Sequence, residues 1–253
     1  RGLALGLDLV PLEPETYRRC ATDTAFRDEL LKDLLLDEEE EEVTWLPQGG
    51  ACGDAEYGVK RLAEEISQYN ADHRGGRHLD VVLPAGTGTT ALYLARHLPP
   101  TCSVHAVPCA TDAAVLLNDV ARLDAATGNH GLLPRILSPT DDVNDTTSST
   151  PKKKYRFGAP SADEWHVWTE LRRAGLFLDL VYAPHTWDVL LRSPLFHGKS
   201  DVLYVHCGGI EGVASQLTRY KRAGFLLDED DNDDDDDKEE RERVLSGASS
   251  SSS

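Results

Sequence analysis

The stretch LDVVLPAGTGTTALYLARH, residues 79–97, decides the fold of this chain. Its apolar run at residues 81–83 is β-branched in part and is followed by a proline, which predicts a short buried strand. A glycine-threonine turn at residues 86–90 follows at once. Residues 91–98 then predict a helix, which two prolines end. A strand, a turn and a helix in this order are typical of an α/β sheet.

Two interpretations of the glycine-threonine turn stay open. Backbone N–H groups at a helix N-terminus, joined by threonine hydroxyls, suit a phosphate group. The alternative is a structural turn in which the threonines cap the helix. The turn has neither the Gly-Lys-Ser/Thr of a Walker loop nor the full GxGxxG spacing of a dinucleotide site. Its candidate phosphate-binding residues are Gly86, Thr87, Gly88, Thr89 and Thr90.

Strands and helices are expected to alternate through the rest of the chain. Apolar runs predict further strands at residues 7–12, 43–46, 103–108, 134–137, 178–182 and 201–206. Helical spacing predicts helices at residues 14–36, 54–69, 110–123 and 212–226, one after Ser161 with a capping box to Glu164, and one that carries Trp187. This alternation predicts a parallel α/β sheet flanked by helices on both faces.

Composition excludes several classes of function. The chain has 253 residues, 40% of them hydrophobic, which is enough for a real core. Much of the formal net charge of −18 lies in two acidic runs, at residues 37–42 and 228–242, and no basic stripe suggests nucleic-acid binding. No apolar stretch approaches the roughly 18 residues that a membrane span needs. We therefore expect a soluble protein with neither a nucleic acid nor a membrane as partner.

The cysteines and the chain start bear on the compartment. Five cysteines without a CxxC pair favour the reduced thiols of an intracellular protein. The chain starts at Arg1 and contains no methionine, so we expect a fragment or a trimmed chain. Any targeting peptide would then lie upstream of Arg1, and the localisation stays open.

Four predicted strand ends carry residues that suit a ligand, and ligands of parallel sheets bind beyond such ends. They are Gly49-Gly50, the turn at residues 86–90, Tyr182, and residues 206–209. Tyr182 is either a proton-transfer group or an aromatic residue at the rim of a site. His206 is a base, a metal ligand or a structural histidine, and the glycines after it suit a close approach to something flat. The chain has no GxSxG elbow, which argues against an α/β-hydrolase.

Six segments form a recognisable series: GGACGDAEYGVKRLAEEI (49–66), LDVVLPAGTGTTALYLARHL (79–98), AVPCATDAA (106–114), YRFGAP (155–160), LDLVYAPHTW (178–187) and LYVHCGGIEGVASQL (203–217). Together they resemble the pyridoxal-phosphate-dependent 1-aminocyclopropane-1-carboxylate deaminase and D-cysteine desulfhydrase family. The resemblance covers residues 2–226 and implies the tryptophan synthase β-like fold, which is fold type II of these enzymes. It also implies that residues 1–48 are the remnant of an incomplete smaller domain, that residues 49–227 form the larger cofactor-binding domain, and that residues 228–253 are a disordered tail.

The resemblance implies roles for single residues. The turn at residues 86–90 would hold the phosphate of pyridoxal 5'-phosphate, and Tyr182 would handle the substrate's amino group or proton. Cys207 and Gly208 stand where members carry an HxGG segment near the cofactor ring. Two departures accompany this match. Ala183-Pro184 replaces the residues that contact the pyridine nitrogen, for which Cys207 is a weak substitute, and the Gly-Asn-Lys segment with the cofactor-binding lysine is missing. Lys60, Lys199 and residues 152–154 offer no replacement.

The expected function is therefore a pyridoxal-phosphate-dependent deaminase or desulfhydrase that acts on a small amino acid such as D-cysteine or 1-aminocyclopropane-1-carboxylate. The chain alone is expected to be inactive, and a homodimer is one possible assembly. The alternative is a non-catalytic homologue or fragment that keeps the fold and a phosphate-binding turn. No metal is expected.

Overall fold

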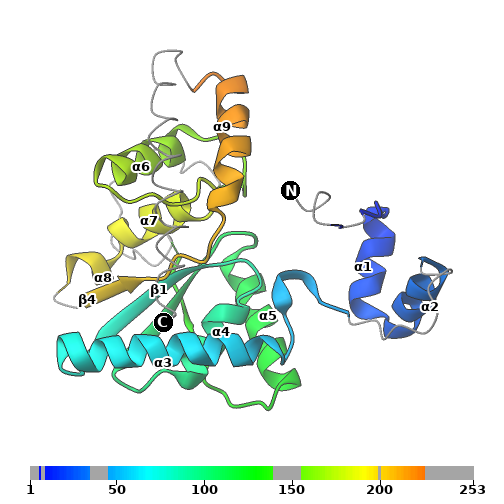
Figure 1. Cartoon of the computed structure of the whole chain (residues 1–253), viewed down its shortest axis with the longest axis horizontal. Coiled ribbons are helices and arrows are strands. Elements are labelled where there is room, and N and C mark those ends of the chain that lie inside the picture. The colour runs from blue at the N-terminus through cyan, green and yellow to red at the C-terminus, as the bar shows by residue number, and fades with distance from the viewer. Residues whose placement is uncertain (1–5, 7–8, 35–44, 139–154, 199–200, 226–253) are drawn as a thin grey trace, which may run out of the picture. The chain divides into compact units, whose positions relative to one another are not determined.

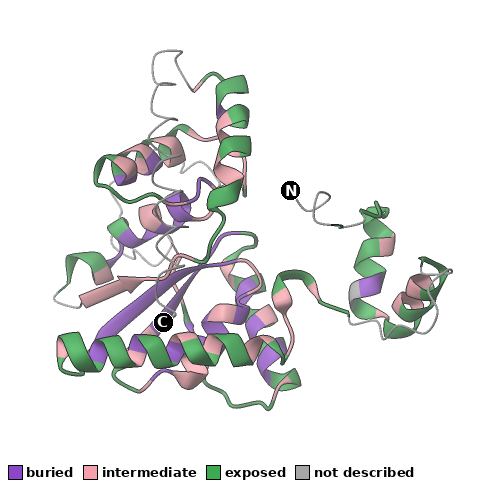
Figure 2. Ribbon diagram, viewed as in Figure 1, coloured by how far each residue is buried: buried purple, intermediate pink, exposed green. Residues whose placement is uncertain are grey.

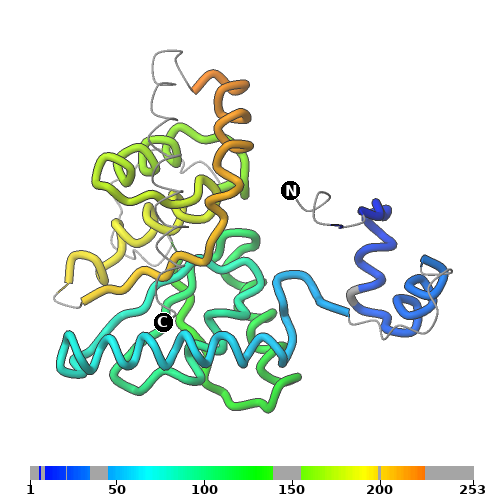
Figure 3. Tube along the Cα trace, viewed as in Figure 1, coloured from blue at the N-terminus to red at the C-terminus, as the bar shows by residue number. Residues whose placement is uncertain are grey.

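A computed structural model describes residues 6, 9–34, 45–138, 155–198 and 201–225. The chain divides into two compact units, Arg1–Ala51 and Cys52–Ser253, which Figure 3 traces. Both acidic runs and the tail at residues 228–253 lie outside the described residues. The domain boundaries expected from the sequence stay predictions, and each unit is described by itself.

The first unit contains the helices α1 (Pro14–Thr22) and α2 (Thr24–Leu34) and a 3-10 turn, η2 (Gln48–Gly50). The single helix expected at residues 14–36 is wrong, because Asp23 separates the two helices in an extended conformation. Oδ1 of Asp23 accepts a hydrogen bond from the N–H of Phe26 at 3.0 Å and so caps the start of α2.

Two strands expected in the first unit are not formed by the residues that the structure describes there. Residues 9–12 and 45–46 are irregular, and residues 7–8 and 43–44 lie outside the described part. Leu9 is 74% exposed and Leu46 is 69% exposed. These apolar runs have no sheet to pair with, so their composition alone does not make them strands.

The second unit is built on a four-stranded parallel sheet (Figure 1). Its strands are β1 (Leu79–Ala85), β2 (Cys102–Pro108), β3 (Arg135–Ile136) and β4 (Asp201–Tyr204). β1 is buried along its whole length, as its continuous apolar run predicted. The parallel α/β sheet expected from the sequence is therefore confirmed, and the four strands lie within the ranges predicted for them or extend those ranges by a few residues.

Helices cover both faces of this sheet, and burial concentrates on the strands between them (Figure 2). On one face α4 contacts β1 and β2, and α3 packs against α4. On the other face Val82 of β1 and Val107 of β2 pack against Val189 and Leu190 of α7. The helices are α3 (Ala55–Arg74), α4 (Thr89–His97), α5 (Ala113–Ala126), α6 (Ala162–Arg173), α7 (Ala183–Arg192), α8 (Pro194–His197) and α9 (Val213–Arg222), and a 3-10 turn, η4 (Ile210–Gly212), precedes α9.

The capping box expected at Ser161 is not formed. Ser161 is the N-cap residue of α6 but makes no side-chain cap hydrogen bond. The Glu164 carboxylate instead accepts a hydrogen bond from the Tyr220 hydroxyl of α9 at 3.4 Å. Tyr220 packs with Trp168 and Leu180 in an aromatic cluster, so tertiary packing overrides the local signal.

The strand order β3-β2-β1-β4 reverses at β1, which indicates where a ligand could bind. β2 and β3 follow β1 on one side, whereas β4 pairs with the other side of β1. Open α/β sheets bind ligands beyond the carboxyl ends of the strands at such a reversal. The turn at residues 86–90 and the segment at residues 205–209 follow β1 and β4, and the N–H of Val205 still donates to the carbonyl of Val82 at 2.8 Å. Both segments therefore leave the sheet at the carboxyl ends of its strands.

Candidate functional site

The turn after β1 leads directly into α4. Its N-cap residue is Gly88, in the left-handed conformation with φ of +80°, and no side chain caps the helix. The hydroxyls of Thr87 and Thr89 hydrogen-bond to each other at 2.9 Å instead. The interpretation of the threonines as N-caps is therefore wrong. The first N–H groups of α4 have no partner within the helix, so they are available to an anion.

Packing also shapes this turn. A Cβ atom on Gly88 would lie 2.3 Å from Cγ2 of Val120 in α5, which leaves room only for glycine. Gly88 and Thr89 are buried, whereas Gly86, Thr87 and Thr90 are half-buried. Gly86, Thr87 and Thr90 would therefore contact a bound phosphate. The buried Gly88 and Thr89 would lie behind them.

Tyr182 stands at the N-terminus of α7. The segment at residues 178–182 was expected to be a strand, but it is an irregular turn. The hydroxyl lies 3.9 Å from the position that a Cβ atom on Gly86 would take. The ring also packs edge-on against Phe157, with centroids 5.2 Å apart. Burial, helped by nearby Cys109 and Asp179, raises the pKa of the Tyr182 phenol above its usual value, so the phenol keeps its proton at neutral pH.

Asp179 explains why this segment is a turn. Its carboxylate is 1% exposed and accepts hydrogen bonds from the N–H groups of Val181 at 2.8 Å, Tyr182 at 2.5 Å and Ala183 at 3.2 Å. An acidic side chain at a helix N-terminus also matches the helix dipole. The sequence analysis missed Asp179, which lies four residues before the first residue of α7 and outside the usual N-cap position. It holds Tyr182 in place.

The segment after β4 approaches the same aspartate. Gly208 and Gly209 have φ values of +100° and +99°, and a Cβ atom on Gly209 would lie 3.2 Å from Cβ of Asp179. The close approach that we expected near His206 is therefore made to Asp179. Nε2 of His206 lies 3.4 Å from Oδ2 of Asp179 but has no hydrogen-bond partner among the described residues.

Cys207 follows β4 in the chain and does not line the pocket described next. Its thiol donates a long hydrogen bond, 3.8 Å, to the carbonyl of Val205. The residue is exposed, yet the protein around the sulfur and the nearby Asp179 carboxylate raise the pKa of the thiol to about 11. At neutral pH Cys207 is therefore a weak neutral donor and no nucleophile.

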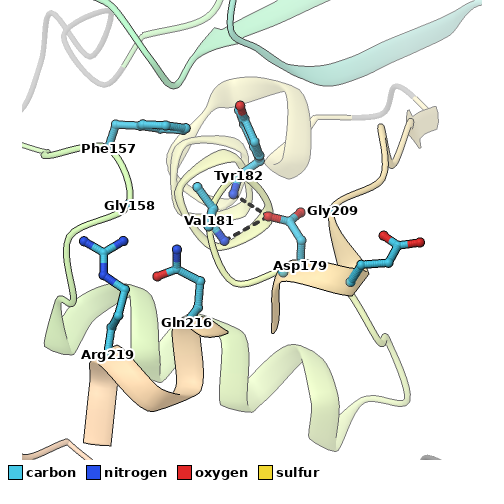
Figure 4. Close-up of a pocket in the computed structure, with 10 residues that line it drawn as sticks. Phe157, Gly158, Asp179, Val181, Tyr182, Gly209, Gln216 and Arg219 are labelled. Carbon is cyan, nitrogen blue, oxygen red and sulfur yellow. Dashed lines mark hydrogen bonds between the residues drawn. The ribbon is translucent and has the colours of Figure 1, made fainter. Parts of the chain in front are cut away.

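A pocket of about 390 Å³ adjoins Tyr182 (Figure 4). Its walls come from the segment before α6, the Asp179 turn, η4 and α9. Arg219 and Gln216, both on α9, point into it, and the sequence analysis singled out neither. The lining residues are Phe157, Gly158, Asp179, Val181, Tyr182, Gly209, Glu211, Gly212, Gln216 and Arg219.

The structure thus brings some predicted residues together and leaves others apart. Gly86 and Tyr182 meet, and Tyr182 and Gly209 share the pocket. Lys60 and Lys221, the lysines described in the second unit, lie on α3 and α9 and do not line it. Within the described ranges no cluster of His, Cys, Asp and Glu could hold a metal ion. No helix there has both the length and the apolar composition that crossing a bilayer requires.

Comparison with known proteins adds no assignment. No protein-family model matches this chain, and no curated protein matches it. Any function must therefore be argued from the residues and their geometry.

Proposed function

We propose that the chain is the cofactor-binding part of a pyridoxal-phosphate-dependent enzyme that deaminates a small amino acid or removes its β-substituent. The observation that carries this proposal is the meeting of the turn after β1 with the Tyr182 hydroxyl, 3.9 Å from a Cβ position on Gly86. A helix N-terminus without a side-chain cap and the half-buried Tyr182 hydroxyl stand there, at the strand-order reversal where α/β sheets bind ligands. The family that the motifs resemble uses both features.

The turn fits the phosphate of this cofactor. The N-terminus of α4 has no side-chain cap, so its N–H groups would bind the phosphate oxygens together with Thr87 and Thr90. The cofactor, when bound, supplies an electron sink for the bonds at the substrate's α-carbon. The Cys207 thiol stands near as a weak donor for a ring atom.

Tyr182 would do the proton work that this chain can supply. The Tyr182 hydroxyl is protonated at neutral pH, as a phenol ordinarily is, and burial raises its pKa further. Asp179 fixes the backbone from which the ring projects. The hydroxyl can therefore donate to a substrate oxygen or nitrogen that enters beside Gly86. The exposed ring of Phe157 contacts the Tyr182 ring edge-on.

The chain alone should bind the cofactor weakly and convert no substrate. The resemblance places the cofactor-binding lysine in a Gly-Asn-Lys segment, which this chain does not contain. Release of sulfide or pyruvate from D-cysteine by the purified chain would contradict this expectation. D-cysteine and 1-aminocyclopropane-1-carboxylate are the proposed substrate types, and a homodimer is the proposed assembly.

The test is a titration of the full chain with pyridoxal phosphate, followed by tryptophan fluorescence and visible absorbance. Thr87→Val and Thr90→Val should each weaken binding about tenfold or more, because each removes a hydrogen bond to a charged group at a half-buried site. Thr101→Val, at an exposed residue just before β2, is the matched control. Inorganic phosphate should compete, and pyridoxal without phosphate should bind less. Equal affinity in all four proteins would overturn the proposed role of the turn.

A non-catalytic homologue is the second candidate, and one observation favours it. The contact of Gly88 with Val120 explains a glycine in the turn without any ligand. In that case the fold and turn persist for packing. The chain would then bind inorganic phosphate and pyridoxal phosphate equally weakly, and Tyr182→Phe would change neither affinity.

A further inference from the structure

The exposed side chain of Arg219 brings a positive charge to the pocket beside Tyr182. Arg219 points into it from α9 (Figure 4), and Nη1 lies 3.6 Å from the position of a Cβ atom on Gly158. Among the residues that the structure describes, the guanidinium has neither an ion-pair partner nor a hydrogen-bond acceptor. A guanidinium in this state offers a two-pronged donor to a carboxylate.

A neighbouring polar atom also lacks a partner. Gln216 lies one helical turn before Arg219 on the same face of α9, and both side chains point into the pocket in Figure 4. Its Oε1 atom is buried and accepts no hydrogen bond within the described ranges. A buried amide without a partner costs free energy unless a ligand satisfies it. The amide can present either its oxygen or its NH2 group to that ligand.

The pocket also contains an unpaired negative charge. Glu211 of η4 lines it and is exposed, and no ion pair with a described residue engages its carboxylate. It does not pair with Arg219, although both line the same pocket. Asp179 is different, because its oxygens already accept three backbone N–H groups. Among the described lining residues, the groups without a protein partner are thus the guanidinium of Arg219, the carboxylate of Glu211 and the Oε1 atom of Gln216, with the rings of Phe157 and Tyr182 beside them.

We propose that this pocket binds a small α-amino acid as its zwitterion. Arg219 binds the carboxylate, and Glu211 and the Oε1 atom of Gln216 accept hydrogen bonds from the ammonium group. The side chain of the amino acid lies against Phe157 and Tyr182. The inference rests on the proposed function in taking this ligand to be the substrate, and it assigns to α9 the residue that selects for a carboxylate.

A carboxylate and an ammonium on one small ligand fit better than either group alone. A simple carboxylate would contact only Arg219 and a simple amine only Glu211, and water would solvate the other, exposed charge. Binding of the zwitterion satisfies both charges in one step, so both ends of the ligand contribute to specificity.

The experiment measures the dissociation constants of D-alanine and L-alanine for the full chain without pyridoxal phosphate, by NMR or tryptophan fluorescence. Propionate and isopropylamine are the single-charge probes. At least one alanine enantiomer should bind at least tenfold more tightly than either probe. Arg219→Gln should weaken that binding about tenfold, and Glu211→Gln should weaken it less. Arg219→Lys should retain part of it.

The matched control is Arg222→Gln, an exposed arginine on α9 that does not line the pocket, and its affinity should stay unchanged. Far-UV circular dichroism confirms that the variants fold. Alanine affinity that is indifferent to Arg219→Gln, or no binding of alanine at all, overturns the inference. Because no cofactor is present, the two proposals fail separately. Binding through Arg219 without any cofactor affinity refutes the cofactor, and cofactor affinity with an indifferent Arg219 refutes this pocket.

Discussion

Replacement of Gly88 by alanine tests how the turn after β1 is held. The backbone there has φ of +80°, and a left-handed conformation costs a residue with a Cβ atom about 1–2 kcal/mol. The added methyl would also meet Cγ2 of Val120 at 2.3 Å and Cδ1 of Leu116 at 3.0 Å. Overpacking of this kind costs about 1–3 kcal/mol. Gly88→Ala should therefore lower the free energy of unfolding by about 2–5 kcal/mol.

Two other glycines separate the cost of backbone strain from the cost of overpacking. Gly208 has φ of +100° with nothing within 4 Å of an added Cβ atom, so Gly208→Ala should cost only the backbone strain, about 1–2 kcal/mol. Gly86 is not left-handed and its added Cβ atom would lie 3.9 Å from the Tyr182 hydroxyl. Gly86→Ala should therefore be near neutral, since replacing glycine also lowers the entropy of the unfolded chain.

Urea unfolding followed by tryptophan fluorescence measures these differences, because Trp165, Trp168 and Trp187 all lie in the second unit. The decisive variant is the double substitution Gly88→Ala with Val120→Ala, which removes the closest contacted methyl, Cγ2 of Val120. It should be more stable than the sum of the single losses by about 1–3 kcal/mol. If Gly88→Ala costs no more than Gly208→Ala, or the double variant shows strict additivity, the packing argument is refuted.

Two further predictions concern buried charges. Burial lowers the pKa of His185 to about 4 from 6.5 and raises that of Glu164 to about 7 from 4.5. As the pH drops from 6.5 to 4, the unfolded chain protonates His185 before the folded chain does, so the free energy of unfolding should fall. As the pH rises from 4.5 to 7, the unfolded chain ionises Glu164 first, so the free energy of unfolding should again fall. With rising pH, the stability of His185→Phe should fall and that of Glu164→Gln should rise, as measured by the urea midpoint at each pH. Parallel pH profiles of the two variants would contradict this. Arg96 is 2% exposed and lies 2.7 Å from Asp124, so Arg96→Met should lower the free energy of unfolding by about 3–5 kcal/mol. Arg192→Met, at a half-exposed side chain, should lower it by at most about 1 kcal/mol. Equal losses would refute the role of burial.

The sheet could be predicted because its signals are local. β1 is a continuous apolar run that ends in a proline and glycines, and α3 carries apolar residues at helical spacing above a charged face. The turn at residues 86–90 could be predicted because a recognisable strand precedes it and a recognisable helix follows it. These features need no knowledge of distant contacts, and the structure places them within a few residues of the prediction.

The turn at residues 178–182 could not be predicted in this way. Its apolar letters are those of a strand, but Leu180 is 2% exposed because it packs with Trp168 and Tyr220 and not within the sheet. Periodicity tells that a side chain is buried and does not tell which neighbour buries it. The same limit hid Arg219 and Gln216, which look like the ordinary polar side of a helix until the pocket wall opposite them is known.

The buried contact beneath Gly88 has a thermodynamic consequence for any anion at the turn. Val120 fixes the backbone of the turn in the ligand-free chain, so its amides are already aimed before binding. Association therefore costs little ordering entropy at this point, and affinity is gained by preorganisation more than by added contacts. A ligand should then raise the melting temperature as the logarithm of its concentration above Kd, without a separate folding step of the turn.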